Sequence, residues 1–217
     1  TTLRDGQQTQ GVDFSVQDKI NIAQALDDMG IDYIEGGWPG ANPTDTKFFE
    51  KNNHFQNAKF TAFGMTKRAG RSADNDPQLR ALIDSNSDSV CLVAKTWDFH
   101  VDLALGISLE ENIDAIKDSI TSVRSGGKEA MIDCEHFFDG FKSNPSFSYQ
   151  CIQTSIDAGA EWVILCDTNG GTLPNEIYKI VNEVTKRFPG NKIGIHCHND
   201  TENAVANSLA AIDSGVR

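Results

Sequence analysis

Two histidines, His196 and His198, lie one residue apart near the carboxyl end of the chain. In a β-strand, side chains at positions i and i+2 point to the same face, so both imidazoles could face one centre. A carboxylate that could join them, Asp5, lies near the amino end. Two imidazoles and a carboxylate form a common ligand set for divalent zinc, manganese, iron or cobalt. The pattern leaves an alternative open, in which both histidines are ordinary strand residues and one is buried in the core.

An arginine adjoins the candidate carboxylate ligand, since Arg4 directly precedes Asp5. A cation beside a metal ion could stabilise the negative charge of an enolate or an alkoxide. Arg4 could instead pair with Glu35, which ends another apolar segment. Both roles are compatible, because such a carboxylate would orient the guanidinium. Arg4 is therefore a candidate for catalysis and for substrate binding, with Glu35 as its partner.

Three more polar residues follow short apolar segments. Glu135 could act as a general acid or base, or bind the substrate or a metal-bound water. Thr168 lies in the run Asp-Thr-Asn-Gly-Gly, which could hold a carboxylate, although a polar turn with glycines explains the same residues. His100 could contact the substrate, but a histidine in a loop is more often a bystander.

The elements that must position these residues alternate along almost the whole chain. Short apolar segments are typical of buried strands, and segments with apolar residues at helical spacing follow them. We expect strands at residues 1–3, 31–35, 59–63, 89–93, 129–135, 161–166 and 192–198, and helices at about 16–29, 43–51, 76–85, 109–124, 146–158, 174–187 and 202–214.

Seven such βα units imply a parallel sheet covered by helices. No Gly-x-Gly-x-x-Gly run follows the first segment, so a dinucleotide-binding open sheet has little support. Polar residues recur at the carboxyl ends of the expected strands, and a barrel gathers such positions at one mouth. We therefore predict that residues 1–217 form one catalytic domain, a TIM (β/α)8 barrel truncated after about seven βα units. An eighth strand would begin at 215–217, so strand eight and any C-terminal domains would lie outside the chain.

Composition restricts the class of protein. The chain has 217 residues and a formal net charge of -12, which argues against nucleic acid or an anionic membrane as a main partner. We see no apolar segment long enough to span a bilayer and no signal peptide. The five cysteines form no Cys-x-x-Cys pair, which favours reduced thiols. We expect a cytoplasmic enzyme.

Four motifs taken together resemble the metal-dependent TIM-barrel family of isopropylmalate, homocitrate and citramalate synthases and hydroxymethylglutaryl-CoA lyases. The resemblance covers essentially the whole chain. Residues 33–43, 97–100 and 135–140 are most similar to the citramalate synthase branch. The motifs are Thr1-Thr2-Leu3-Arg4-Asp5-Gly6-Gln7-Gln8, Ile34-Glu35-Gly36-Gly37, Asp167-Thr168-Asn169-Gly170 and His196-Cys197-His198-Asn199-Asp200.

The resemblance implies an acyltransferase that condenses acetyl-CoA with a small α-keto acid, of which pyruvate, giving citramalate, fits best. A metal-bound ketone would be attacked by the enolate of acetyl-CoA, and the thioester would then be hydrolysed. Asp5, His196 and His198 would hold the divalent ion, which would be magnesium, manganese or zinc.

The same resemblance implies roles for the other candidates. Arg4 would stabilise charge on the reacting oxygen, and Glu35 would orient it. Thr168 would bind the keto-acid carboxylate, and Glu135 would act near the acetyl group. The family also implies a homodimer for the full-length form.

Other functions stay open at this point. The chain could belong to a 2-isopropylmalate synthase that uses 2-oxoisovalerate, or to a hydroxymethylglutaryl-CoA-type lyase that runs the related cleavage. It could also be a metal-binding or interaction domain derived from such a barrel. A fourth ligand, an asparagine that follows strand eight in the lyases, has no counterpart in this sequence.

Overall fold

A computed structural model describes residues 1–51, 54–188 and 192–216 of the chain. Its centre is a parallel sheet of six strands, each paired with the next along the sequence. The strands are β1 (Tyr33–Gly37), β2 (Lys59–Met65), β3 (Ser89–Lys95), β4 (Glu129–Glu135), β5 (Trp162–Asp167) and β6 (Ile193–Cys197).

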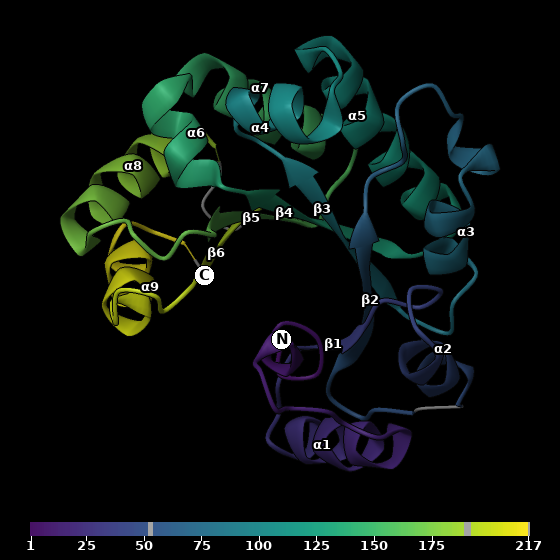
Figure 1. The fold of residues 1–217 in the computed structure, drawn as a ribbon. Helices are drawn as coiled ribbons and strands as arrows, with labels where there is room; N and C mark the ends of the chain where they lie inside the picture. Colours follow the sequence, from purple (N-terminus) through teal and green to yellow (C-terminus); the bar gives the residue numbers. More distant parts are fainter. Residues whose placement is uncertain (52–53, 189–191, 217) are drawn as a thin grey trace.

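The sheet curls into an arc, and the helices lie on its convex side (Figure 1). The predicted TIM-barrel architecture is therefore confirmed, as an incomplete barrel of six parallel strands. The longer helices are α1 (Val16–Asp28), α2 (Pro43–Glu50), α3 (Pro77–Ile83), α5 (Leu109–Ser125), α6 (Phe137–Ser143), α7 (Pro145–Asp157), α8 (Pro174–Arg187) and α9 (Ala204–Asp213). The short ones are η1 (Gly6–Gln8), η2 (Ala73–Asn75), α4 (Asp98–His100) and η3 (Val101–Leu105).

Helix α1 illustrates how the sequence sets an element's ends. The Ser15 side chain accepts a hydrogen bond from the backbone N–H of Asp18, and the Asp18 carboxylate accepts one from the N–H of Ser15. This capping box satisfies two N–H groups at the start of the helix that have no partner within it. At the other end, Gly30 has a φ of 78°, a left-handed conformation in which glycine carries no Cβ penalty.

Strand side chains alternate between the helix layer and the interior of the curl. On β3, Val90 and Leu92 are fully buried against the helices, whereas Cys91 packs on the inner side. Cys91 lies beside Phe63 on β2 and Met131 on β4 in the strand register, and these three form a small apolar cluster below the mouth. Strand side chains alternate with a period of two. Residues two and four positions after these cluster residues therefore lie on the same inner face, progressively closer to the mouth at the carboxyl ends of the strands.

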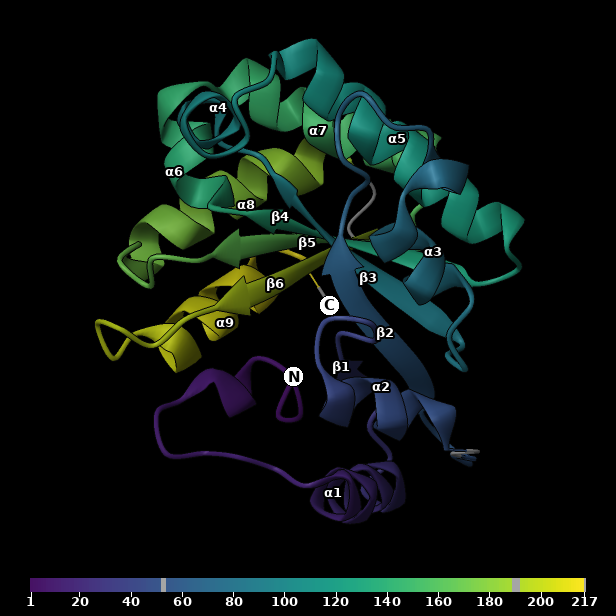
Figure 2. The same cartoon turned by 45° about the vertical axis from the view of Figure 1, so that its right-hand side comes forward.

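The predicted first strand at residues 1–3 is wrong. The carbonyl oxygen of Thr1 accepts hydrogen bonds from the backbone N–H groups of Arg4 (3.1 Å) and Gly6 (3.0 Å), so this segment is a turn. These amides are used within the segment and pair with no strand. The segment nevertheless lies between β1 and β6 at the open side of the sheet, where the first strand was expected (Figures 1 and 2).

Two predictions at the carboxyl end also need correction. The last helix begins at Ala204 and not at residue 202, because Glu202 has a φ of 61°, which a right-handed helix cannot accommodate. The expected start of an eighth strand at 215–217 falls on a turn at Ser214 and Gly215, and Arg217 lies outside the described residues. Within the ranges that the structure describes, no helix is both long and apolar enough to cross a membrane.

Candidate active site

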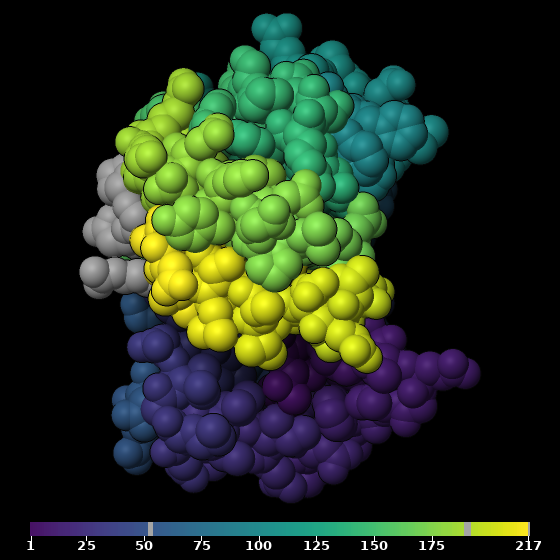
Figure 3. Space-filling view, turned by 90° about the vertical axis from the view of Figure 1, so that its left-hand side faces the viewer, coloured from purple at the N-terminus to yellow at the C-terminus, as the bar shows by residue number. Residues whose placement is uncertain are grey.

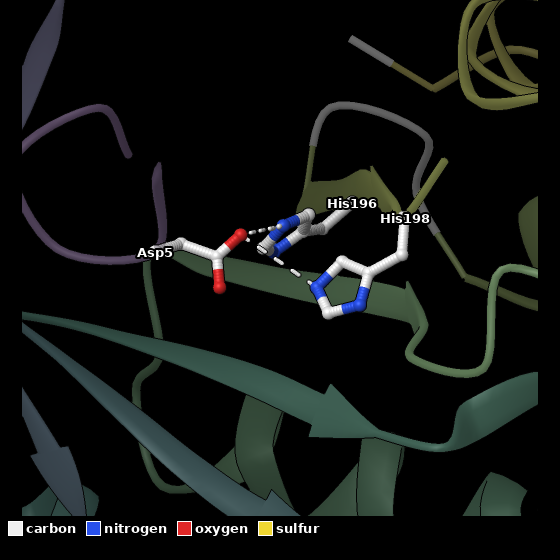
Figure 4. A group of neighbouring side chains, drawn as sticks. All are labelled: Asp5, His196 and His198. Atoms are coloured by element: carbon white, nitrogen blue, oxygen red, sulfur yellow. Dashed lines mark ion pairs between the residues drawn. The ribbon is translucent and has the colours of Figure 1, made fainter. Parts of the chain in front are cut away.

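The three candidate metal ligands lie together at the mouth of the curl (Figure 4). Oδ2 of Asp5 is 3.3 Å from Nε2 of His196 and 3.6 Å from Nε2 of His198. Asp5 is the residue that precedes η1, whereas His196 lies on β6 and His198 directly follows that strand. The two imidazoles lie on one side of the strand, as their spacing predicts.

The donor set of this cluster fits a divalent metal ion. One carboxylate oxygen and two imidazole nitrogens lie within 4.8 Å of one another. This is the nitrogen and oxygen set that zinc, manganese and iron share. Asp5 and His196 also perturb each other electrostatically. The hydrogen bond from His196 lowers the pKa of Asp5 to about 2, and the same bond raises the pKa of His196.

Arg4 is surrounded by carboxylates. Its Nε donates to Oε1 of Glu35 at 2.6 Å, and its Nη1 lies 3.3 Å from Oδ1 of Asp5. A third carboxylate, that of Asp133, lies 3.9 Å from Nη2, and the guanidinium stacks 3.7 Å above the ring centre of Phe63. Burial lowers the pKa of Arg4, but the three carboxylates raise it above its usual value. The arginine is therefore a fixed, permanent positive charge at the site.

Asp133 is a site residue that our sequence analysis missed. It lies on the inner face of β4, is 7% exposed, and its pKa is raised to about 6, first by burial and then by the charge of Glu35. The signal that could have found it was its spacing. Asp133 is two residues before Glu135 on the same strand, so both side chains face the interior.

Glu135 ends β4 and pairs with Lys95, which is its neighbour in the register of β3 and β4. Each residue is part-buried at the mouth, so the two charges compensate one another beside the metal-ligand cluster. Lys95 ends an apolar strand as Glu135 does, yet we did not predict it as a site residue. Its role depends on the strand pairing, which the sequence does not specify.

Thr168 and His100 have different positions relative to the mouth. The Thr168 hydroxyl accepts a hydrogen bond from the backbone N–H of His136 at 2.8 Å, which helps to hold His136 at a φ of 54°. His100 packs instead against the rings of Trp97 and His136, at centroid distances of 4.5 and 4.4 Å. Burial, and then the charge of His136, lowers the pKa of His100.

A cavity of about 290 Å³ joins most of these groups. The predicted site residues that line it are Arg4, Asp5, Glu135, Thr168, His196 and His198. Glu35 and His100 are not among the lining residues. Glu35 instead accepts a hydrogen bond from Arg4, which does line the cavity. A second cavity, of about 510 Å³, shares Trp38, Met65 and Lys95 with the first.

The chain is similar to several known proteins. A sequence profile of the HMGL-like family matches residues 1–217. The (R)-citramalate synthase of Aquifex aeolicus is 52% identical over 219 residues, which cover 100% of this chain and 42% of that enzyme. The 2-isopropylmalate synthase of Listeria innocua is 36% identical over 222 residues, again covering 100% of this chain and 42% of that enzyme. The chain thus spans about two fifths of the length of these relatives.

The fold has counterparts among solved structures. The crystal structure of the Bacillus subtilis HMG-CoA lyase superposes with a TM-score of 0.83 and 18% sequence identity. The match covers 99% of this chain and 72% of the lyase chain. At this level of identity the likeness concerns the barrel fold alone.

Proposed function

The chain belongs to the HMGL-like family, and on that premise we propose that it is the barrel of an acyltransferase that condenses acetyl-CoA with a small α-keto acid. The observation that carries the proposal is the convergence of Asp5, His196 and His198 beside Arg4 in one cavity. The keto acid is pyruvate and the product citramalate. The 52% identity with a citramalate synthase, against 36% with a 2-isopropylmalate synthase, supports this choice.

A divalent ion held by Asp5, His196 and His198 would act as a Lewis acid on the keto oxygen of the acid. Arg4 lies beside Asp5, so its guanidinium would take part of the negative charge that develops on this oxygen. Glu35 acts on the reaction through Arg4. Its 2.6 Å hydrogen bond fixes the guanidinium before the substrate arrives, which reduces the reorganisation needed in the transition state.

Thr168 binds the carboxylate of the keto acid. Its oxygen accepts from the N–H of His136, and among the described residues its hydroxyl donates to no other group. The hydroxyl hydrogen is therefore available to a carboxylate. Glu135 acts near the acetyl group, where Lys95 holds its carboxylate in place.

Acetyl-CoA would enter through the second cavity, which adjoins the first at Trp38 and Lys95. Lys67 and Arg68 line it, and cationic side chains suit the phosphates of coenzyme A. Apolar residues such as Ile107 in the same lining suit the pantetheine arm. This arrangement would bring the thioester toward Glu135.

The decisive experiment measures release of coenzyme A from acetyl-CoA by the full-length protein. We expect turnover with pyruvate to be far faster than with 2-oxoisovalerate. Arg4→Gln should lower kcat by about 10²- to 10³-fold, as expected for loss of a group that stabilises developing charge. The control is Arg80→Gln, because Arg80 is an exposed arginine that makes an i, i+4 pair with Asp84 and lines neither cavity.

Several outcomes would contradict the proposal. A preference for 2-oxoisovalerate would assign the protein as an isopropylmalate synthase. Formation of acetoacetate from hydroxymethylglutaryl-CoA would assign it as a lyase. No turnover in either direction would favour a metal-binding or interaction domain. Homodimer formation and a cytoplasmic location stay predictions, and light scattering of the full-length protein tests the first.

A further inference from the structure

A fully buried lysine lies beneath the candidate site. Lys19, on α1, is 0% exposed, and its ammonium donates to the carbonyl oxygens of Leu3 at 2.8 Å and Gly36 at 3.0 Å. The same ammonium forms an ion pair with the carboxylate of Asp45 on α2. A buried charge is costly unless it is paired and hydrogen-bonded. Here three oxygens satisfy the three N–H groups of the lysine.

The two carbonyl groups belong to the segments that carry the site. Leu3 directly precedes Arg4 and Asp5, and Gly36 directly follows Glu35. Lys19 therefore connects the backbone that bears the arginine to the backbone that bears its carboxylate partner. The Arg4–Glu35 hydrogen bond joins the same two segments through their side chains.

Leu3 packs in the same buried core cluster as Ile34 of β1, but among the described residues backbone pairing does not connect the two segments. Throughout the described part of the chain, no backbone–backbone hydrogen bond joins residues 1–5 to β1. In a complete barrel a strand ladder would fix the position of such a segment. The Lys19 ammonium makes the connection that such a ladder would make, because it binds one carbonyl group of residues 1–5 and one of β1.

Asp45, the third partner of the Lys19 ammonium, is itself held by several contacts. Its Oδ2 accepts from the backbone N–H of Trp38 and from the side-chain amide of Asn42, both at 2.9 Å. Its carboxylate also occupies the space that a Cβ on Gly37 would need, since the nearest atom would lie at 2.5 Å. Asp45 is thus tied to the end of β1 and supplies the counter-charge of the Lys19 ammonium from that side.

We propose that Lys19 is a positioning residue that holds Arg4 and Asp5 in place for metal and substrate binding. This inference rests on the proposed metal site. The alternative is that Lys19 merely stabilises the packing of α1 against β1. In that case its loss would lower stability and leave the geometry of the metal ligands unchanged.

The test uses three variants of the full-length protein. In Lys19→Met with Asp45→Asn, the ammonium is lost and no buried charge is left unpaired. Asp45→Asn alone removes the counter-charge of the lysine but leaves both of its carbonyl partners, so it separates the ion pair from the connection between the two segments. A third variant, Ile120→Val, lowers stability by removing a methyl group from a fully buried side chain on α5, away from the connection.

Two readouts are compared at a temperature well below unfolding. The first is hydrogen exchange of the backbone amides in residues 1–8, and the second is the Kd for manganese. We expect the double variant to exchange faster there and to bind manganese at least tenfold more weakly. Asp45→Asn and Ile120→Val should stay within about twofold of the wild-type Kd.

Unchanged exchange at residues 1–8 in the double variant would overturn the inference. So would faster exchange with an unchanged manganese Kd, since the lysine would then order the segment without positioning the ligand. If the wild-type protein bound neither manganese, magnesium nor zinc, the proposed metal site would fail by itself. Hydrogen exchange would still decide whether Lys19 holds the segment.

Discussion

The individual residues at the mouth carry more negative than positive charge. Arg4 is one cation among the carboxylates of Asp5, Glu35 and Asp133, whereas Lys95 and Glu135 compensate each other. If all three carboxylates were ionised, the group around Arg4 would have a charge of about −2, which a divalent cation would balance. The raised pKa of Asp133, about 6, reflects this excess as well as its burial.

Metal affinity should therefore depend on pH through the imidazoles. A metal ion binds neutral imidazole, so it competes with the proton that Asp5 helps His196 to retain. Because the pKa of His196 is raised above 6.5, competition should begin at a higher pH than for an ordinary histidine. Asp5, with a pKa of about 2, stays ionised throughout. We expect the manganese Kd to rise by about tenfold for each unit of falling pH per proton displaced.

Calorimetric titration between pH 5 and pH 8 measures this dependence. Asp5→Asn is the informative variant, because it removes the carboxylate whose hydrogen bond raises the pKa of His196. This variant should bind manganese more weakly at every pH. The proton on His196 should also begin to compete with manganese at a lower pH than in the wild-type protein. A manganese Kd that does not change over this range in the wild-type protein would mean that the imidazoles are not ligands.

At the scale of the elements, the spacing of residues on strands was the most informative feature of the sequence. His196 and His198 lie on one face because strand side chains alternate, and Arg4 reaches Glu35 because their segments lie next to each other. The strand predicted at residues 1–3 was wrong because strand formation requires a paired neighbour, and local apolar character does not supply one. His100 stays a predicted substrate contact, and its orientation depends on packing against Trp97, which spacing does not encode.

Helix α6 packs against the loop that follows β3, and Gly140 makes this close contact possible. A Cβ at Gly140 would lie 2.5 Å from the carbonyl oxygen of Thr96 and 2.8 Å from Cα of Trp97, both of them backbone atoms. We expect Gly140→Ala to lower the free energy of unfolding by about 1–3 kcal/mol, because overpacking outweighs the better helix propensity of alanine. Urea unfolding at equilibrium measures the difference.

Gly171 provides the matched control for this substitution. A Cβ there meets no atom within 4 Å, and Gly171 is not among the glycines with positive φ. Gly171→Ala should therefore change the free energy of unfolding by less than about 0.5 kcal/mol. A Gly140→Ala variant as stable as Gly171→Ala would show that α6 can move away from the loop without cost.

At the scale of the whole molecule, the candidate metal site joins segments from opposite ends of the chain. Residues near the amino end, in purple, lie against residues near the carboxyl end, in yellow, on one face of the molecule (Figure 3). No backbone–backbone hydrogen bond links residues 1–8 to β6 in the part of the chain that the structure describes. Side-chain contacts from Asp5 to His196 and His198 cross this boundary, so a metal ion bound there would tie both sides of the curled sheet together.

Metal binding should therefore stabilise the full-length protein against heat. Free manganese at 100 times its Kd would stabilise the folded state by about 2.7 kcal/mol, which corresponds to a rise of a few degrees in Tm. Asp5→Ala should abolish this rise, because it removes the only ligand on the amino-terminal side among the described cluster residues. Asp13→Ala, which removes an exposed aspartate from the segment that follows, should retain it. Calorimetric scans with manganese and with EDTA decide the matter. An equal rise in the wild-type protein and in Asp5→Ala would mean that the stabilising ion binds elsewhere.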